Sequence, residues 1–564
     1  MIRGIPGTTS KAQMNINRII EYAGTIHRNR EVVSKTEQGP FRYTYGDMYE
    51  RVGKLARALD TLGVRAGEAV TVFGANTHRS VESLYAVPGL GATLYTANPR
   101  MTFNQIEYCL RHVSNHAPNR IAVLEPGHVE LVGRIVEDTG QEFEHYVVLG
   151  SASDVAGSLP FDPISYSEDL IAEQEAGYEW EEVDETTAVL LMFTTGTTGR
   201  PKPIAHSHRG IWLHSVGMCA SLSINALDSV IVIPALYHQG WFLWVAAPFV
   251  GARMVLPGAN PSPNDYVDLI LDERVTFTSA VSTQFAMMLD EFKSRDEVDL
   301  NRLRIYFAGQ ATPERLMRQY DELGADARQL YGFSECGPHF VENAPRVLRE
   351  PFSSPEEYSR FKASVAGFPA CGTAIRLIDE SGGDLPWDGE SSGSVTFKAL
   401  WATTKYWNDP EATAASRVGE DWIQVGDMAT MDPEGHVRIF DRVKDAIKSG
   451  GEWIPTPLLE SAIASHPSVA EAAVVAASHP KWMERPIALV RPTAEQWDSF
   501  SEEELRAFLA ELADRGEVNK WWIPDRILRV EEIPKTSVGK FDKKILRDRY
   551  KDVLAQGTGR EPTR

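Results

Sequence analysis

Short, uninterrupted apolar runs recur along the first half of the chain and are separated by segments with helical periodicity. They cover residues 69–73, 121–124, 146–149 and 188–193. A strand that is apolar at every position is buried on both faces, which is typical of parallel sheets covered by helices. The sequence therefore predicts an α/β fold of mostly parallel sheets.

A helix is predicted to begin after Thr44, because Thr44 and Asp47 have the spacing of a capping box. Apolar residues at positions 48, 52, 55, 59 and 62 then share one face, and Gly63 follows as a stop signal. The next predicted strand, residues 69–73, follows closely, as expected for alternating helices and strands.

The last part of the chain has a different pattern. A hairpin is predicted over residues 435–447, a short helix before Pro467, and a strand over 472–477. Ser501 and Glu504 predict a capped helix that ends near Ala513. A chain of 564 residues is long enough for several domains. We expect a large N-terminal domain of stacked sheets, residues 1–441, and a small α+β domain, residues 442–564.

The charge balance excludes some partners. Lys and Arg number 57 and Asp and Glu 78, which gives a net charge of −21. Such acidity argues against nucleic acid or an anionic membrane as the main partner. An anionic substrate would need positive groups gathered locally.

Cysteine usage and apolar content bear on location. The four cysteines (Cys109, Cys219, Cys336 and Cys371) are scattered and form no CxxC pair. We therefore expect neither a disulfide framework nor a zinc site, and we expect a cytoplasmic location. The first residues have no apolar core of a signal peptide, and the most apolar stretch, 241–250, is too short to span a membrane.

The segment FTTGTTGRPKP, residues 193–203, directly follows a predicted buried strand. Its threonine hydroxyls, glycine N–H groups and lysine are suited to holding phosphate oxygens. It is not a Walker A loop, because Pro201 stands where the second glycine of that motif belongs. Taken alone, the segment is equally compatible with an ordinary polar turn.

Further motifs follow in order: PALYHQGW (234–241), GQATP (309–313), YGFSECGP (331–338), QVGD (424–427), DRVKDAIKSGGEWIP (441–455) and PKTSVGKFDKK (534–544). With the threonine-rich loop, they resemble the adenylate-forming superfamily of acyl-CoA synthetases, luciferases and adenylation domains. SGGEW (449–453), HPSVAEAAVV (466–475) and TANPR (96–100) most resemble its medium- and long-chain fatty acyl-CoA synthetases.

The resemblance implies a reaction in two halves. A carboxylate attacks the α-phosphate of ATP with Mg²⁺, which gives acyl-AMP and pyrophosphate. The thiol of coenzyme A then displaces AMP. The implied substrate is a hydrophobic carboxylic acid, whether a medium- or long-chain fatty acid, an aromatic acid or a polycyclic one. Because two anions meet in the first half, charge neutralisation and positioning dominate.

The resemblance also implies roles for individual residues. Lys540 bridges the carboxylate and the α-phosphate, His238 positions the carboxylate, and Glu335 with Thr194 binds Mg²⁺. Asp427 binds the ribose, and Arg442 the ribose or a phosphate. The other residues expected around the nucleotide are Thr195, Gly196, Thr197, Thr198, Gly199, Lys202, Gly309, Gln310, Ala311, Gln329, Tyr331, Gly332 and Ser334.

Lys444 occupies the position of the family's hinge, about which the C-terminal domain rotates between the two halves. The expected coenzyme A site comprises Lys448, Gly450, Gly451 and Trp453, and the expected acyl pocket comprises Trp241, Phe242, Val281, Ser282 and Thr283.

Departures from the family pattern, including Pro203, Gln310 and Ser282, fall partly on the acyl-pocket segments. Together with Trp241 and Trp244, which suggest a wide apolar wall, they leave an aromatic or polycyclic acid open equally with a straight-chain fatty acid.

Two other functions stay open. An acyl-AMP ligase that loads a carrier protein shares the first half-reaction, although no carrier attachment signature follows Lys544. A non-catalytic nucleotide-binding protein is disfavoured, because Glu335, Asp427 and Lys540 are all present. An amphipathic pattern over residues 16–26 also suggests a homodimer.

Overall fold

The computed structural model describes residues 10–154, 160–162, 164–194, 200–309, 312–342, 352–419, 422–450, 452–535 and 541–554. Their strands form four sheets: one of seven strands, one of nine and two of five. The first three sheets use strands up to Arg442, and the fourth uses strands from Ile447 onward. The predicted α/β class, with a large N-terminal and a small C-terminal domain, is confirmed.

The seven-stranded sheet contains the apolar runs found in the sequence. Its order is β7 (Ile164–Tyr166), β6 (His145–Val148), β5 (Ile121–Leu124), β3 (Ala69–Phe73), β4 (Thr93–Thr96), β8 (Ala188–Thr194) and β9 (Lys202–Ser207). All neighbours are parallel except β8 and β9. The strand predicted at 146–149 begins and ends one residue earlier.

The nine-stranded sheet has the order β16 (Phe368–Pro369), β15 (Gly337–Glu342), β14 (Asp326–Phe333), β13 (Arg304–Ala308), β12 (Phe277–Val281), β10 (Ser229–Ile231), β11 (Arg253–Leu256), β1 (Glu31–Thr36) and β2 (Gly39–Thr44). The run from β14 to β1 is parallel. The carboxyl ends of parallel strands meet at one edge of a sheet, where ligands commonly bind. The motif segments 234–241, 309–313 and 331–338 follow β10, β13 and β14 at that edge.

One large core joins these two sheets to helices that include α1 (Asn17–Ile26), α2 (Tyr45–Thr61), α3 (His78–Gly89), α7 (His208–Leu222) and α8 (Trp241–Val250). The predicted capping box of α2 is present between Thr44 and Asp47. The apolar face of α1, including Ile19 and Ile20, is buried in this core beside α2 and α8. That face is therefore already covered by the chain itself.

The other helices of the large domain cover the sheets and their edges. They are α4 (Phe103–His116), α5 (Val129–Thr139), α6 (Ser167–Ala172), α9 (Pro263–Asp272), α10 (Ser282–Lys293), α11 (Glu314–Glu322), α12 (Pro355–Ser364) and α13 (Pro410–Ser416), with short turns η1 (Pro126–His128), η2 (Ala152–Asp154) and η3 (Leu236–Gly240). Among the described helices, none combines the length and apolar character that a membrane span requires.

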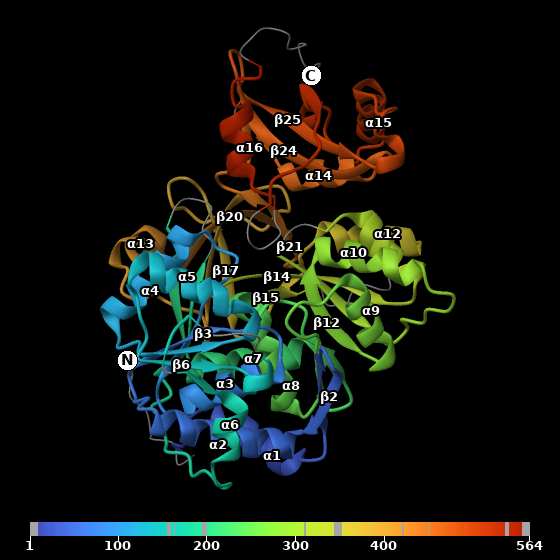
Figure 1. Cartoon of the computed structure of the whole chain (residues 1–564). Coiled ribbons are helices and arrows are strands. Elements are labelled where there is room, and N and C mark those ends of the chain that lie inside the picture. The colour runs from blue at the N-terminus through green and yellow to red at the C-terminus, as the bar shows by residue number, and fades with distance from the viewer. Residues whose placement is uncertain are drawn as a thin grey trace.

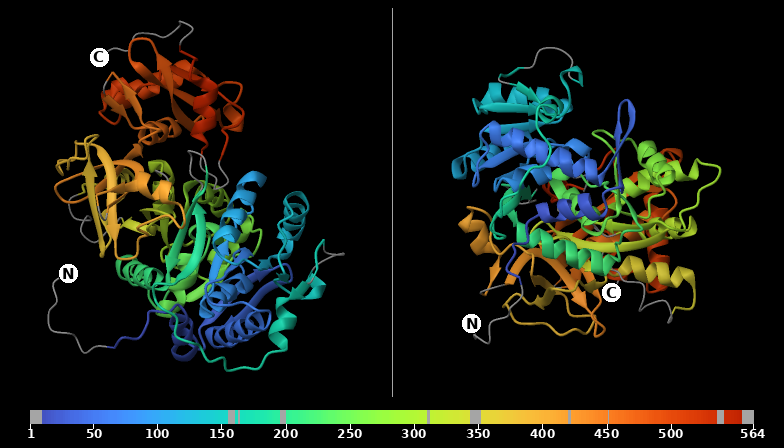
Figure 2. Two further views of the ribbon diagram at one scale, coloured as in Figure 1. Left: turned by 90° about the vertical axis from the view of Figure 1, so that its left-hand side faces the viewer. Right: turned by 90° about the horizontal axis from the view of Figure 1, so that it is seen from below.

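The third sheet comprises β17 (Thr373–Ile378), β18 (Gly393–Ala399), β20 (Trp422–Met431) and β19 (Arg417–Val418), with β21 (Val437–Arg442) paired to β20. The fourth comprises β23 (Glu452–Ile454), β22 (Ile447–Ser449), β25 (Met483–Pro492) and β24 (Val469–His479), with β26 (Arg526–Arg529) paired to β25. Helices α14 (Thr456–Ala464), α15 (Glu502–Asp514) and α16 (Lys543–Tyr550) and turns η4 (Ala494–Gln496) and η5 (Lys520–Trp522) belong to the fourth-sheet unit. This small domain lies at one end of the molecule, opposite α1 and α2 (Figures 1 and 2).

The hairpin predicted over residues 435–447 is wrong. Strand β21 pairs with β20 in the third sheet, whereas β22 pairs with β23 and β25 in the fourth. Between them the chain turns at Arg442, whose carbonyl accepts hydrogen bonds from the N–H groups of Asp445 and Ala446. The apolar pattern located both strands but not their partners, because pairing depends on residues distant in sequence. The predicted boundary between 441 and 442 stays a prediction.

A buried histidine anchors the start of α1. The backbone N–H of Ile16 donates a hydrogen bond of 3.1 Å to His208 Nδ1. Burial lowers the pKa of His208 to about 4. The native state therefore holds this ring neutral, as an acceptor, while the unfolded chain takes up a proton at higher pH.

We predict that the free energy of unfolding falls as the pH drops from about 6.5 to about 4, because the unfolded state then binds more protons at His208 than the native state. The contribution is on the order of 3 kcal/mol. In His208→Asn the amide oxygen replaces the acceptor without titrating, so denaturant titrations should show a shallower pH dependence. The same change at exposed His116 is the control, and equal slopes for both variants would contradict the account.

Candidate functional site

Several predicted site residues lie outside the described part of the chain. They are Thr195, Gly196, Thr197, Thr198 and Gly199 of the threonine-rich loop, Gln310 and Ala311, Gly451, and Lys540. The remaining predicted residues are described, and most of them fall into one connected cluster.

The centre of this cluster is the carboxylate of Glu335. The hydroxyl of Tyr406 donates a hydrogen bond of 2.5 Å to Glu335 Oε1. Lys202 Nζ lies 4.9 Å from the centroid of the Tyr406 ring. Thr194 pairs with Lys202 in the antiparallel register of β8 and β9, so the predicted loop leaves and re-enters the sheet at this point. Lys202, which pairs with Thr194, and the distant residue Glu335 are thus brought together.

Glu335 is a buried acid, with 8% of its surface exposed. Burial raises the pKa of its carboxyl group, while the hydroxyl of Tyr406 and the charge of Lys202 act in the opposite direction. The backbone also holds the residue, because Thr403 N–H donates to the carbonyl of Glu335 at 2.8 Å. The segment around residues 403–406 therefore fixes both the main chain and the side chain of Glu335.

A second buried carboxylate, Asp427, lies beside this group. Asp427 on β20 pairs in register with Arg442 on β21, and Arg442 Nε lies 3.2 Å from Asp427 Oδ1. The Tyr331 hydroxyl donates a hydrogen bond of 2.6 Å to Asp427 Oδ2. Asp427, Tyr331 and Glu335 all raise the pKa of Arg442, Asp427 most strongly. The charge of Arg442 thereby links the two carboxylates.

Other predicted nucleotide residues have structural contacts. The Gln329 amide donates to the carbonyls of Lys362 and Ala363 at 3.2 and 2.5 Å, so this side chain holds α12 against β14. Gly309 ends β13 with a φ of +83°, a conformation that favours glycine. Gly332 lies within β14, and Ser334 follows its end.

The segment that contains His238 reaches the same place from β10. It forms the turn η3, in which His238 has non-helical φ and ψ of −116° and −113°. The next residue, Gln239, donates a hydrogen bond of 3.2 Å from Nε2 to Ser334 Oγ. The motifs PALYHQGW and YGFSECGP are therefore in direct contact.

The predicted acyl-pocket residues lie on two segments of the large domain. Trp241 and Phe242 begin α8 and are 1% exposed, and the Trp241 ring centroid lies 5.2 Å from that of His206. Val281 ends β12, and Ser282 and Thr283 begin α10. Ser282 Oγ lies 3.3 Å from Thr312 Oγ1. Trp244, expected in a pocket wall, is fully buried in the core that α8 shares with the sheets.

The predicted coenzyme A residues lie on the small domain. Lys448 and Trp453 face each other across the β22–β23 hairpin, with Lys448 Nζ 5.0 Å from the Trp453 ring centroid and 2.8 Å from Glu380. Gly450 N–H donates to the Trp482 carbonyl. This hairpin thus contacts Glu380 of the large domain in the observed arrangement.

Lys444 lies between the third and fourth sheets. Nearby, Asp441 Oδ2 accepts hydrogen bonds from the N–H and hydroxyl of Thr456 at 2.9 and 2.6 Å. Lys444 Nζ is buried without a hydrogen-bond partner among the described residues. Burial, assisted by Arg442 and Arg547, lowers the pKa of Lys444 to about 8.

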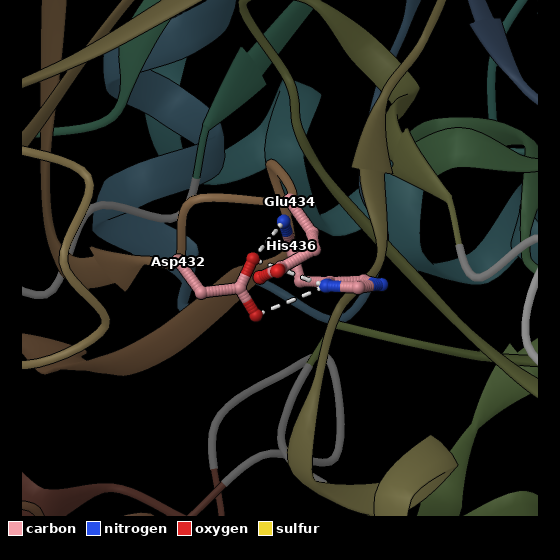
Figure 3. A group of neighbouring side chains, drawn as sticks. All are labelled: Asp432, Glu434 and His436. Carbon is pink, nitrogen blue, oxygen red and sulfur yellow. Dashed lines mark hydrogen bonds and ion pairs between the residues drawn. The ribbon is translucent and has the colours of Figure 1, made fainter. Parts of the chain in front are cut away.

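Asp432, Glu434 and His436 gather at the turn between β20 and β21 and offer three ligand atoms to a cation (Figure 3). Asp432, however, already accepts hydrogen bonds from the N–H and the Nδ1 of His436 at 2.9 and 3.0 Å. The His436 ring packs 4.3 Å from that of Phe368. These contacts stabilise the turn, and we assign the cluster no metal.

Sequence reasoning missed Tyr406, His206 and Gln239. Tyr406 is 71 residues from its partner Glu335, and no spacing rule links the two. Gln239 lies within the motif 234–241, and His206 lies three residues after the segment 193–203, so their positions in sequence are the signal that could have found them.

Comparison with known proteins identifies the family. The AMP-binding enzyme model matches residues 21–407, and the AMP-binding enzyme C-terminal domain model matches residues 458–540. The chain therefore belongs to the AMP-binding enzyme family, which confirms the predicted resemblance.

Two relatives match along nearly their whole length. The long-chain-fatty-acid–CoA ligase of Thermus thermophilus is 37% identical over 559 residues, which covers 98% of each chain. The medium-chain-fatty-acid–CoA ligase of Ectopseudomonas oleovorans is 32% identical and covers 98% of this chain and 99% of its own. The crystal structure of the anthranilate CoA ligase AuaEII in complex with anthranoyl-AMP shares the fold, with a TM-score of 0.82, 24% identity and coverage of 96% and 98%.

We predict that Lys444 destabilises this arrangement while it is protonated. Its native pKa is about 8 against 10.5 in the unfolded chain, so the unfolded state binds more protons between these values and stability rises with pH there. The free energy of unfolding of the wild type, relative to that of Lys444→Gln, should therefore rise with pH across this interval. Lys520→Gln, at an exposed lysine, is the control. Parallel curves for wild type and Lys444→Gln would contradict the prediction.

Proposed function

We propose that this enzyme is an ATP-dependent acid–CoA ligase that forms acyl-AMP and pyrophosphate and then acyl-CoA and AMP. One observation carries the proposal: in a chain of this family, Lys202, Thr194 and the buried Glu335 meet beside the Asp427–Arg442 pair. The two CoA ligases that match the chain from end to end support coenzyme A as the acceptor.

In the proposed complex the nucleotide replaces contacts that the site now makes internally. Asp427 accepts hydrogen bonds from the ribose hydroxyls, a role for which a carboxylate with two oxygens is suited. Arg442 contacts the ribose or a phosphate, and Tyr331 and the Gly309 turn border the base. The threonine-rich loop and Lys202 hold the phosphates.

The donor set fits Mg²⁺. Glu335 and Thr194 offer a carboxylate and a hydroxyl, the oxygen ligands that this cation prefers together with phosphates and water. When bound there, Mg²⁺ supplies charge that neutralises the phosphates. Ionised Glu335 is needed for this, and the Tyr406 hydroxyl and Lys202 favour that form.

In the first half-reaction a carboxylate oxygen of the acid bonds to the α-phosphorus, and the bond from that phosphorus to the β-phosphate bridge breaks. Lys202 and Lys540 neutralise the negative charge that gathers there, and His238 orients the acid. In the second half-reaction the sulfur of coenzyme A gives up its proton to solvent and bonds to the acyl carbon, the bond from that carbon to the phosphate oxygen breaks, and AMP leaves. Gly309 and Ser334 are proposed as positioning residues.

The small domain is proposed to serve both halves by moving about Lys444, with the boundary between 441 and 442. Lys540 acts in the first half, and the hairpin with Lys448, Gly450, Gly451 and Trp453 receives coenzyme A in the second. The ion pair of Lys448 with exposed Glu380 is a weak contact that such a movement can break.

The acid is proposed to be hydrophobic, bordered by Trp241, Phe242 and the 281–283 segment. The long- and medium-chain ligases support this class. A cytoplasmic location, supported by four free cysteines, stays a proposal that fractionation tests. A homodimer also stays a proposal. The apolar face of α1 is buried, but Tyr22 and Ile26 of the same helix are exposed and could contact a second copy; sedimentation tests whether the protein dimerises.

The test is pyrophosphate release with ATP, Mg²⁺ and a panel of fatty, aromatic and polycyclic acids, with and without coenzyme A. Acid-dependent pyrophosphate followed by CoA-dependent thioester supports the ligase. Pyrophosphate with transfer only to a carrier protein would favour the acyl-AMP ligase. ATP binding without pyrophosphate for any acid would favour a non-catalytic protein.

We predict that Lys540→Ala slows acyl-AMP formation by at least about 100-fold, because a charge that stabilises the transition state is lost. Transfer of the acyl group from supplied acyl-AMP to coenzyme A should keep its rate, since this half does not use Lys540. Equal loss in both halves, measured by single-turnover thioester formation, would contradict the division of roles.

We predict that Tyr406→Phe keeps the ring beside Lys202 but lowers kcat/KM for ATP about 10-fold, because the buried Glu335 loses its hydroxyl donor. The acidic limb of the pH profile should move to higher pH, since that hydrogen bond lowers the pKa of Glu335. Tyr320→Phe, which removes a hydroxyl bonded to the Phe285 carbonyl, is the matched control. If the acidic limb of the pH profile and the Mg²⁺ concentration that Tyr406→Phe requires both equal those of the wild type, the role of Tyr406 is refuted.

A further inference from the structure

Three buried polar atoms beside the nucleotide cluster have no hydrogen-bond partner within the described chain: His206 Nε2, Gln239 Oε1 and Trp241 Nε1. His206 is 5% exposed and Trp241 1%. Buried polar atoms left without partners destabilise a fold, and native proteins pair nearly all of them. Three such atoms in one place indicate a polar group that comes from elsewhere.

Gln239 and His206 both bond to Ser334, and Trp241 packs against His206. Gln239 Nε2 donates to Ser334 Oγ at 3.2 Å, and the His206 ring hydrogen-bonds the Ser334 backbone. The rings of His206 and Trp241 have centroids 5.2 Å apart. Ser334 directly precedes Glu335, and His206 follows Lys202 on β9. The three residues therefore border the place where the acid meets ATP.

The chemistry of the unpaired atoms selects the missing group. Burial lowers the pKa of His206 to about 4, so its ring is neutral at pH 7. The bond to the Ser334 backbone favours protonation, as expected when the ring donates to a carbonyl, which leaves Nε2 as an acceptor. Gln239 Oε1 is also an acceptor, whereas Trp241 Nε1 is only a donor. A hydroxyl group donates one hydrogen bond and accepts others, so it can pair with one of the two acceptors and with the Trp241 donor at once.

We propose that the acid activated by this enzyme has a hydroxyl group on its acyl part, bound by His206 Nε2 or Gln239 Oε1 as acceptor and by Trp241 Nε1 as donor. This inference rests on the proposed acid–CoA ligase function and narrows its substrate to hydroxylated hydrophobic acids. An unhydroxylated acid of the same shape leaves the three atoms unpaired, and such a site discriminates strongly against it.

The test compares matched acids by the rate of pyrophosphate release. Octanoate, decanoate and 3-phenylpropanoate are each paired with forms hydroxylated at single, successive carbons. The best hydroxylated acid is expected to exceed its parent at least about 10-fold in kcat/KM. Parents that equal or exceed every hydroxylated form overturn the inference and leave the ligase function standing. No pyrophosphate with any acid overturns the ligase function itself.

Variants at His206 test the assignment of the site. His206→Leu should reduce the ratio of kcat/KM for the hydroxylated acid to kcat/KM for its parent about 10-fold. His206→Gln retains an acceptor and should restore part of the preference. His128→Leu, at a histidine bonded to the Phe73 carbonyl, is the control. Trp241→Phe provides a second variant if His206→Leu does not fold, and an unaltered preference in whichever variant folds overturns the site.

Discussion

The burial of two carboxylates, Glu335 and Asp427, is the constraint on which the rest of the site depends. A carboxylate removed from water needs hydrogen-bond donors or positive charge, and the fold supplies both. Tyr406 and Lys202 serve Glu335, while Tyr331 and Arg442 serve Asp427. These partners come from three different sheets or their connecting segments, so the site exists only where the sheets meet.

Much of the architecture could be predicted from local pattern. The apolar runs at 69–73 and 121–124 are strands with those bounds, and Thr44 caps α2 as expected. Local pattern failed where pairing is decided at long range. Residues 437–442 and 447–449 are both strands, but the first pairs with β20 and the second with β25. The sequence between them does not specify these partners.

The residues of the site that belong to sequence motifs could be singled out from the sequence. The motifs singled out Lys202, Glu335, Asp427 and Arg442, and the structure brings these residues onto adjoining segments. They gave no sign of Tyr406, because a hydroxyl that stabilises a buried acid can come from any segment that passes nearby. Trp244 shows the opposite error, since an apolar residue in a motif can belong to the core as readily as to a pocket. The roles of these residues stay proposals.

The arrangement of the small domain connects structure to the proposed chemistry. Its hairpin with Lys448 contacts Glu380, while Asp441 and Thr456 join the last strand of the large domain to α14. Few and largely polar contacts of this kind allow two rigid bodies to change their relative orientation without loss of either core. One active site can then be completed by different faces of the small domain in turn.

The most direct test of the account is a crystal structure of the enzyme with Mg²⁺ and a non-hydrolysable acyl-AMP analogue. The account predicts ribose hydroxyls on Asp427, the phosphate mimic beside Lys202 and Thr194, and Tyr406 still bonded to Glu335. An analogue bound elsewhere, or bound here with Asp427 and Glu335 turned away from it, would contradict the assignment of this cluster as the nucleotide site.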